Sequence, residues 1–329
     1  MTRTGRDVYR WTLVVLGVLT LALLAVLWRR TRSQEPQTAR REPIKAITFN
    51  VQFLPSVGQF FNKRPDAEYR ARTLGQALAA YDIIGLNEVF DLRPRQLLVA
   101  GLRERLGDDF HCVTAPASER SAFGIDSGLL FISRLPIRSS HSLRFGNDSS
   151  VWKHGPAADG FAAKGVLHAR IGRSGETEDF IDAFITHLES YDDAIREAQY
   201  SLLTKFIHKH SDPHRPVLVM GDFNTDGRPR FMKDRGSPYH RMMTQLQQGR
   251  PGALLCDLWP LHSAKPGGTN APETADGGKR IDYIFISNPA GGNSCLTSTA
   301  VRVNPFRDSK VLSLSDHSAV EVDLEWYHP

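Results

Sequence analysis

The sequence predicts an α/β domain in which two packed β-sheets are flanked by helices. Between residues 44 and 324, short apolar or β-branched runs that are typical of buried strands alternate with longer segments of helical spacing. The strand-like runs outnumber the helices between them, whereas a parallel sheet needs a crossover between successive strands. The pattern therefore favours two sheets over a single parallel one.

The elements are expected in the following order. Strands are predicted at 44–51, 82–86, 127–132, 137–145, 164–171, 179–185, 217–220, 281–286, 300–303 and 319–324. Helices are predicted at 66–80, 94–106 and 192–210, where apolar residues recur three or four positions apart. Residues 249–279 are rich in Gly and Pro and are expected to be irregular. No repeat of 20 to 50 residues is present.

The N-terminus differs from the rest of the chain. Trp11 to Trp28 form an uncharged run of about 18 residues with a tryptophan at each end, which predicts a transmembrane helix. A cleaved signal peptide is the alternative, but the run is long for one and no small-x-small site precedes Arg29. We expect a basic tail at 1–10, an anchor at 11–28, a polar linker at 29–43 and a folded domain at 44–329. The short tail favours a cytoplasmic N-terminus with the domain outside, although arginines flank both ends of the run.

Charge argues against a nucleic-acid ligand. The first 42 residues hold 8 of the 41 Lys and Arg residues and 3 of the 36 Asp and Glu residues, which leaves 33 of each sign in the domain. A domain without net charge lacks the basic excess expected of a nucleic-acid binder. Cys112, Cys256 and Cys295 include no close pair, so a zinc cage is not expected, whereas one disulfide stays open. The oligomeric state is not indicated.

Gly221-Asp222-Phe223-Asn224 is the most informative motif, because it follows the buried strand at 217–220. If the extended backbone continues, Asp222 and Asn224 lie on one face at the end of a strand, where open α/β folds often place their chemistry. A simple turn is the alternative. Other polar side chains also follow predicted strands. They are Asn50, Glu88, His187, Asp282, Asp316 and His317.

These residue types fit the hydrolysis of a phosphoester. Glu88 and Asn50 offer oxygen ligands suited to Mg²⁺, with Mn²⁺ or another divalent cation as the alternative. His187 and His317 titrate near neutrality and suit acid or base roles. Asp282 is available to orient an imidazole or a water molecule. A divalent metal with two histidines suits in-line attack of water on phosphorus.

The motifs resemble those of the endonuclease/exonuclease/phosphatase superfamily, which has the deoxyribonuclease-I-like fold. They occur in the order typical of that superfamily: Thr48-Phe49-Asn50, Asn87-Glu88, Thr186-His187, Gly221-Asp222-Phe223-Asn224, Ile281-Asp282-Tyr283 and Ser315-Asp316-His317. The one mild departure is Asn87, where a glutamine usually stands. The resemblance spans about residues 44–325 and implies a four-layer α-β-β-α sandwich of two packed mixed sheets.

The resemblance also implies a role for each residue. Asn50 and Glu88 would hold Mg²⁺. His317 would be the general base that activates water, assisted by Asp282 or Asp316. The scissile phosphate and the leaving group would be contacted by His187, Asp222 and Asn224.

Two segments resemble the neutral sphingomyelinase branch. Phe90-Asp91 follows Glu88 closely, and Asp159 to Lys164-Gly165 matches the Asp-x₄-Lys-Gly pattern of that branch. Lys164 would bring positive charge to the phosphate, switched by Asp159, unless it is merely an exposed lysine at the start of a strand. The resemblance and the anchor together predict a membrane-lipid substrate, cleaved as by a phospholipase C. The headgroup stays open. A nuclease of the same fold and a non-catalytic, membrane-anchored binding module are the alternatives.

Overall fold

The computed structural model describes residues 40–54, 64–115, 126–146, 163–173, 179–291 and 294–328. The predicted membrane span at 11–28 and Asp159 lie outside these ranges. Within them, no helix is both long and apolar enough to cross a bilayer. Strand β1 begins at Arg40, inside the segment 29–43 that the composition predicts as a linker.

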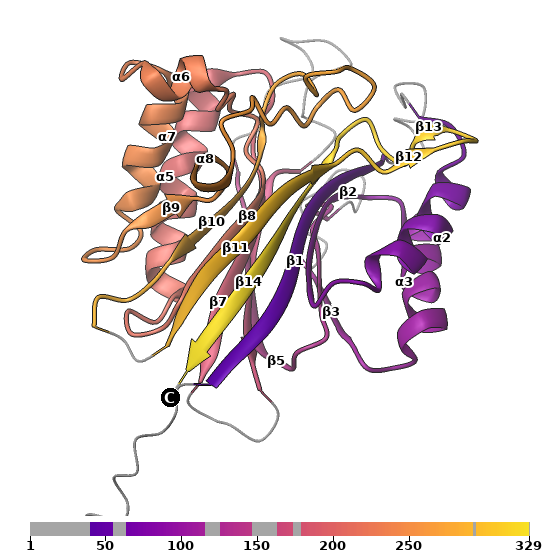
Figure 1. Ribbon diagram of the computed structural model, residues 1–329, viewed down its shortest axis with the longest axis horizontal. Helices are drawn as coiled ribbons and strands as arrows, with labels where there is room; N and C mark the ends of the chain where they lie inside the picture. Colours follow the sequence, from indigo (N-terminus) through magenta and orange to yellow (C-terminus); the bar gives the residue numbers. More distant parts are fainter. Residues whose placement is uncertain are drawn as a thin grey trace, which may run out of the picture. The chain divides into compact units, whose positions relative to one another are not determined.

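Two mixed six-stranded sheets form the centre of the described domain (Figure 1). The first has the strand order β11-β14-β1-β2-β4-β3, in which β1 and β2 run parallel and β4 pairs antiparallel with both β2 and β3. Its strands are β1 (Arg40–Phe53), β2 (Ile83–Val89), β3 (His111–Thr114), β4 (Leu130–Ser133), β11 (Cys295–Asn304) and β14 (Ala319–His328).

The second sheet has the order β5-β6-β7-β8-β10-β9. Its parallel pair is β7 and β8, and the other neighbours run antiparallel. Its strands are β5 (Ile137–Arg144), β6 (Gly165–Gly172), β7 (Phe180–His187), β8 (Val217–Asp222), β9 (Leu255–Asp257) and β10 (Asp282–Ser287). A small ribbon of β12 (Arg307–Asp308) and β13 (Leu312–Ser313) stands apart from both sheets.

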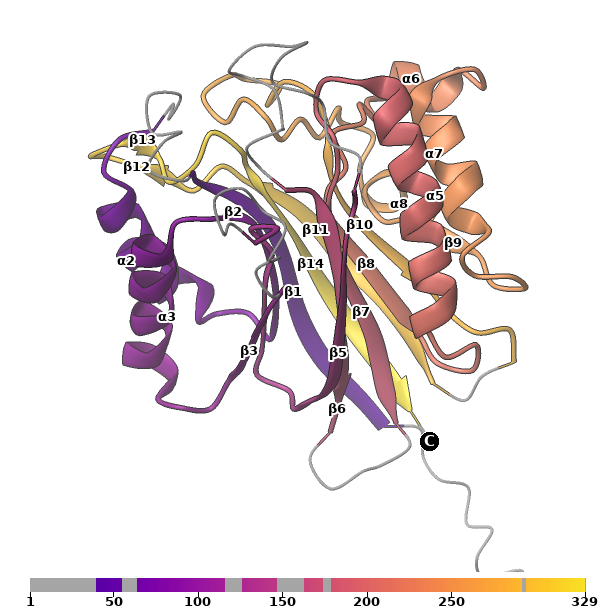
Figure 2. The same ribbon diagram turned by 180° about the vertical axis from the view of Figure 1, so that it is seen from behind.

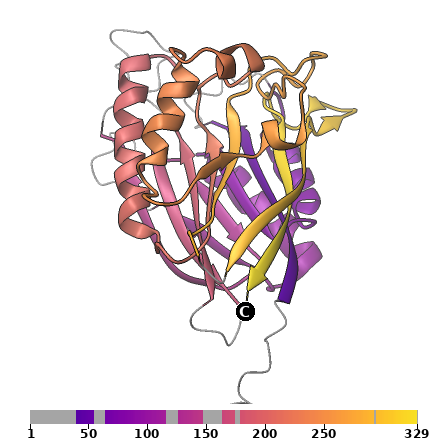
Figure 3. The ribbon, with the colours of Figure 1, turned by 60° about the vertical axis from the view of Figure 1, so that its left-hand side comes forward.

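Helices cover the outer face of each sheet (Figures 1 and 2). The first sheet carries α2 (Ala67–Leu78) and α3 (Leu92–Leu106). The second carries α5 (Asp193–His210) and α7 (Pro238–Gln247), which lie side by side in Figure 3, near the short helices α6 (Pro229–Lys233) and α8 (Trp259–His262). The side chain of Asp192 accepts hydrogen bonds from the Ala194 and Ile195 amides and so caps α5.

The period of two along each strand distributes its side chains between different cores. In β7, Ile181 and Ile185 face the core between the sheets, whereas Phe184 packs beneath α5 and α7. Glycine at position 85 lets the sheets approach closely, because a Cβ there would lie 2.4 Å from Ile185 Cγ2. Three cores thus separate four layers: one lies between the sheets and one beneath each helical layer.

The predicted arrangement of two packed mixed sheets between helices is confirmed. All ten predicted strands and all three predicted helices have a counterpart at nearly the expected residues. The sequence prediction missed α7 and the short elements β3, β9, β12, β13, α6 and α8. The three cysteines are free thiols, so the disulfide left open by the sequence is not formed.

Candidate active site

Side chains from both sheets meet at one end of the sandwich. This is the end at which strand β1 finishes, in the upper part of Figure 1. His187 and Asp222 are the last residues of the parallel strands β7 and β8, and they pair in register. Asn50 and Glu88 lie near the ends of the parallel strands β1 and β2. Asp282 begins β10 and lies directly opposite Asp222. His317 lies two residues before the start of β14. Residues up to 267 positions apart therefore share one edge.

The backbone turns sharply at the Gly-Asp-Phe-Asn motif. Gly221 has a φ of 140°, and a Cβ on it would lie 2.0 Å from the Thr186 carbonyl oxygen of β7. Strand β8 ends at Asp222, and Asn224 adopts a left-handed φ of 50°. The extended backbone therefore does not continue, contrary to the condition under which Asp222 and Asn224 would share a face. The Asn224 amide group instead donates to the Leu188 carbonyl, and its backbone N–H donates to Asp222 Oδ1.

Asn50 joins the two sheets at the centre of the site. Its side-chain Nδ2 donates to Glu88 Oε1 and to Asp222 Oδ2, at 3.0 Å in each case. Its Oδ1 accepts a hydrogen bond from the Gln52 amide. In this orientation Asn50 holds two carboxylates together, and its oxygen would reach a metal only after the amide group rotated. Glu88 is the more open of the two acids, with its side chain 19% exposed against 2% for Asp222.

His317 and Asp282 form a buried pair across the two sheets. The distance from His317 Nδ1 to Asp282 Oδ2 is 2.9 Å, and His317 Nε2 lies 3.9 Å from Asp222 Oδ2. The carboxylate accepts at Nδ1, which places the proton of the neutral ring there and leaves Nε2 as the free base. The backbone of His317 is held by Ser315, whose hydroxyl accepts from the His317 amide and donates to the Asn50 carbonyl.

Lys164 and His187 form a second buried pair. Lys164 Nζ lies 2.8 Å from His187 Nε2, and the lysine is 1% exposed, which contradicts an exposed lysine at the start of a strand. An ammonium group can only donate, so Nε2 accepts and the ring proton sits on Nδ1. The same Nε2 lies 3.6 Å from Asp222 Oδ2 and 3.9 Å from Glu88 Oε1.

Burial and mutual charge shift the titration of the whole cluster. Burial and the Asp282 carboxylate raise the pKa of Asp222 to about 7, and burial and Asp316 raise the pKa of Glu88. Burial and the Lys164 charge lower the pKa of His187 well below its usual value. Burial alone would also lower the pKa of His317, but Asp282 and the neighbouring carboxylates outweigh it and hold that pKa well above 6.5.

Gln52 and Arg70 support the site and were not singled out from the sequence. Gln52 Nε2 donates to Asp316 Oδ2 at 2.8 Å, and the negative charge of Asp316 also helps to raise the pKa of His317. The buried Arg70 guanidinium donates to the carbonyls of residues 51, 52 and 314 and so ties β1 to the loop that carries His317. Gln52 stands two residues after Asn50 on the same strand, a spacing that could have indicated it. Arg70 lies on a predicted helix, and no motif indicates it.

The residues present fit a hard divalent cation. Asp222, Asp282 and His317 each place a ligand atom within 4.8 Å of the other two. Among the described residues, Asp282 Oδ1 is buried without a hydrogen-bond partner, and Glu88 and Asp222 crowd like charges that a cation would neutralise. Carboxylate and amide oxygens outnumber imidazoles here, which suits Mg²⁺ or Mn²⁺ better than Zn²⁺.

Residues 47–317 match the sequence profile of the Endonuclease/Exonuclease/phosphatase family. The chain belongs to the endonuclease/exonuclease/phosphatase family. Members of this family are hydrolases that act on phosphodiester bonds. The family predicted from the motifs is therefore confirmed.

A comparison with individual proteins links the chain more narrowly to sphingomyelinases. A sphingomyelinase of Dictyostelium discoideum is 30% identical over 183 residues, which cover 46% of this chain and 38% of that protein. The match therefore spans well under half of that relative's length. It agrees with the resemblance to the sphingomyelinase branch.

Solved structures of low identity share the fold. Sphingomyelinase C from Streptomyces griseocarneus is 18% identical, with a TM-score of 0.58 over 86% of this chain and 99% of that one. A beta toxin variant from Staphylococcus aureus with bound magnesium ions is also 18% identical, with a TM-score of 0.59 over 88% of this chain and 100% of that one.

Proposed function

We propose that the protein is a membrane-anchored, Mg²⁺-dependent phosphodiesterase that releases the phosphorylated headgroup of a phospholipid. Sphingomyelin or a related lipid would be cleaved as by a phospholipase C. The observation that carries the proposal is the convergence of Glu88, Asp222, His187 and the His317–Asp282 pair at one edge of the sandwich. The sphingomyelinase relative supports a lipid substrate.

His317 is placed to accept the proton of the attacking water. Its Nδ1–H is held by Asp282, so Nε2 is free at the end of the site that faces Asp222. As the proton arrives, the buried Asp282 carboxylate stabilises the imidazolium that forms. The side chain of His317 is 11% exposed, so it is not fully closed off from solvent.

Lys164 and His187 are placed to bind the phosphate. The Lys164 ammonium is desolvated, so its attraction to a phosphoryl oxygen is stronger than at a surface. His187 stays neutral at physiological pH. It can therefore donate a hydrogen bond to the phosphate, while Lys164 alone supplies the positive charge. Asp159 is proposed to modulate Lys164, as the resemblance implies.

Glu88 and Asp222, with Asn50 once its amide rotates, are the residues that would hold Mg²⁺. When bound, the ion polarises the phosphoryl oxygen and lowers the pKa of water. The bound magnesium ions of the beta toxin support this choice of cation. The chain's own contribution is to keep two carboxylates close together, which the Asn50 amide does by donating to both.

A hydrolysis assay on a lipid panel tests the proposal. The full chain is given sphingomyelin and glycerophospholipids in mixed micelles, with and without Mg²⁺, and the released phosphorylated headgroup is measured. We expect turnover that needs Mg²⁺ and falls at least about 10²-fold in Glu88→Ala. Glu104→Ala, an exposed acid on α3, should match the wild type. If no lipid in the panel releases a phosphorylated headgroup, the lipid proposal is wrong.

A nuclease is the second candidate, because endonucleases belong to the same family. Plasmid nicking with a steep salt dependence would favour it, since a protein with 6 to 10 phosphate contacts loses about 10³- to 10⁵-fold in affinity between 50 and 200 mM salt. The equal numbers of acidic and basic residues in the domain argue for the lipid instead. A non-catalytic binding module would show no turnover on either substrate.

A further inference from the structure

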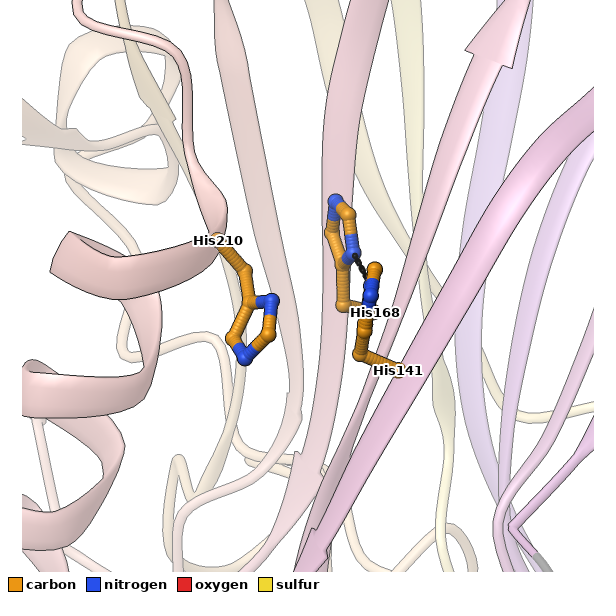
Figure 4. A group of neighbouring side chains, drawn as sticks. All are labelled: His141, His168 and His210. Atoms are coloured by element: carbon orange, nitrogen blue, oxygen red, sulfur yellow. Dashed lines mark hydrogen bonds between the residues drawn. The ribbon is translucent and has the colours of Figure 1, made fainter.

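Three histidines, drawn in Figure 4, meet on the second sheet. They lie away from the end of the sandwich that carries Glu88 and Asp222, which is the acid-lined edge. His141 on β5 pairs directly with His168 on β6, and His210 is the last residue of α5, the helix that covers this sheet. The ring centroid of His210 lies 4.3 Å from that of His141 and 5.9 Å from that of His168. His168 follows Lys164 by four strand residues, about 13 Å along the chain at the rise of a β-strand.

One pair of nitrogens already has the spacing found at a tetrahedral metal centre. The Nδ1 atoms of His141 and His168 are 3.4 Å apart. Two imidazole nitrogens bound to one tetrahedral Zn²⁺ at about 2.0–2.1 Å stand about 3.3 Å apart. One nitrogen from each histidine lies within 4.8 Å of the other two. A small shift of His210 at the end of α5 would bring all three nitrogens to the distance that a single bound metal ion requires.

Asp182 fixes the orientation of the central histidine. His168 Nε2 lies 2.9 Å from Asp182 Oδ1, and both residues are buried. The carboxylate accepts a hydrogen bond from the Nε2–H group, so the lone pair of Nδ1 points towards His141. A carboxylate behind a histidine is the usual support of a metal-binding imidazole, because it fixes the tautomer and the ring plane. Arg170 also donates to Asp182 and holds it in place.

The surroundings of the two outer histidines disfavour their protonated form. Burial and the neighbouring His141 lower the pKa of His210 to about 4, and burial and His168 lower the pKa of His141. Protons and metal compete for the same lone pairs, so imidazoles that resist protonation are ready ligands at neutral pH. Arg170 and Lys209 bring positive charge nearby and Asp182 brings negative charge.

We propose that His141, His168 and His210 bind one late first-row transition-metal ion, with Zn²⁺ the expected occupant, at a site separate from the phosphoesterase centre. Three imidazoles suit Zn²⁺, Cu²⁺ or Ni²⁺, whereas the oxygen-rich centre suits Mg²⁺. The ion joins β5 and β6 to the end of α5. Because His141 is exposed, the fourth position opens to solvent.

Calorimetric titration of Zn²⁺ into the metal-stripped full chain in detergent tests the site. Saturating Mg²⁺ is present throughout, and Asp222→Asn is titrated in parallel so that binding at the acid-lined edge is recognised. We expect one Zn²⁺ per chain in both proteins. Affinity should fall at least about 10-fold in His141→Ala and His210→Ala and stay unchanged in His208→Ala, an exposed histidine on the same helix.

Thermal unfolding gives a second readout. Zn²⁺ should raise the unfolding temperature of the wild type and of His208→Ala by a few degrees and raise that of His210→Ala by clearly less. A wild type that binds no Zn²⁺ beside Mg²⁺ overturns the proposal. So does Zn²⁺ binding that disappears in Asp222→Asn or survives in both His141→Ala and His210→Ala.

Discussion

Asp282 determines what His317 can do. The carboxylate is buried, accepts at Nδ1 and raises the pKa of the ring, so it both selects the tautomer and favours the protonated state. A general base must be neutral before it accepts the proton and charged afterwards, so its pKa must be high enough to hold the proton but not so high that the ring is already protonated. The positive charge of a cation at Glu88 and Asp222 would lower the pKa of His317 again, whereas the hydrogen bond to Asp282 would still keep the ring proton on Nδ1.

Asp282→Asn separates these two effects. The amide keeps the shape but removes the negative charge, so the pKa of His317 falls and stabilisation of the imidazolium is lost. We expect kcat to drop on the order of 10²-fold while the acid limb of the pH–rate profile moves to lower pH. Headgroup release measured between pH 5 and 9 checks both, with Asp109→Asn, an exposed acid, as the control. An unmoved acid limb would exclude His317 as the base.

Asp222 makes the stability of the metal-free protein depend on pH. Its pKa is 3.8 in an unperturbed chain and about 7 in the fold. Between these values the folded protein holds a proton that the unfolded chain releases, so this group's contribution to stability falls as the pH rises from about 4 to about 7. Asp222→Asn should flatten that slope.

Thermal unfolding in EDTA at pH 5, 6, 7 and 8 measures the difference between the two proteins. His187, with its lowered pKa, acts in the opposite direction below pH 6.5 in both proteins. The comparison therefore reports the Asp222 carboxyl together with its effect on the neighbouring His317, whose pKa it helps to raise. Equal slopes for the wild type and Asp222→Asn would contradict a raised pKa at this carboxyl.

The residues that gather at the site were predictable from the sequence, but their contacts were not. Polar residues after buried strands indicated Asn50, Glu88, His187 and Asp222, because parallel strands end at one edge. Which atom of Asn50 faces the acids depends on a hydrogen bond to Gln52, and the sequence carries no sign of it. These contacts arise only when the two sheets pack.

At the scale of elements, the close approach of β7 and β8 places His187 beside Asp222. The approach depends on glycine at 221, where the φ of 140° is open to glycine and the Thr186 carbonyl occupies the place of a Cβ. Gly221→Ala should therefore lower the free energy of unfolding by about 3 kcal/mol or more and reduce activity with it.

Denaturant unfolding of Gly221→Ala and Gly146→Ala makes the matched comparison. Within the described part of the chain, no atom lies within 4 Å of the position of a Cβ at Gly146, so alanine there should be nearly neutral. If both variants unfolded at the wild-type denaturant concentration, the strained glycine would not be needed to hold the two strand ends together.

The elements that could be predicted from the sequence were those with a clear pattern of apolar residues over their own length. Helix α5 repeats apolar residues over 18 positions, and β8 is an unbroken buried run. Helix α7 was missed because it is 10 residues long, begins with Pro238 and lies beside a Gly/Pro-rich region. Strand β9 has three residues, too few for a period, and exists because it pairs with β10.

At the scale of the whole chain, charge and hydrophobicity are divided between two regions. The first 42 residues carry the entire net charge of +5 and the apolar run, and the folded domain is neutral. A neutral domain gains little from attraction to an anionic surface. Under the proposed function, a lipid phosphodiesterase of this composition needs residues 11–28 as its anchor to reach a bilayer, so removal of these residues should affect bilayer substrates alone.

A chain that begins at Arg40 tests this dependence. It retains every residue of the described domain, so we expect wild-type hydrolysis of lipid in detergent micelles. On vesicles of the same lipid the rate should fall about 10²-fold, because the tether no longer raises the effective concentration at the surface. Vesicle flotation measures binding in parallel. Leu16→Arg with Leu19→Arg in the full chain should reproduce the loss, because charged residues oppose insertion. Equal vesicle rates for the truncated and full chains would show that residues 1–39 do not serve as the anchor.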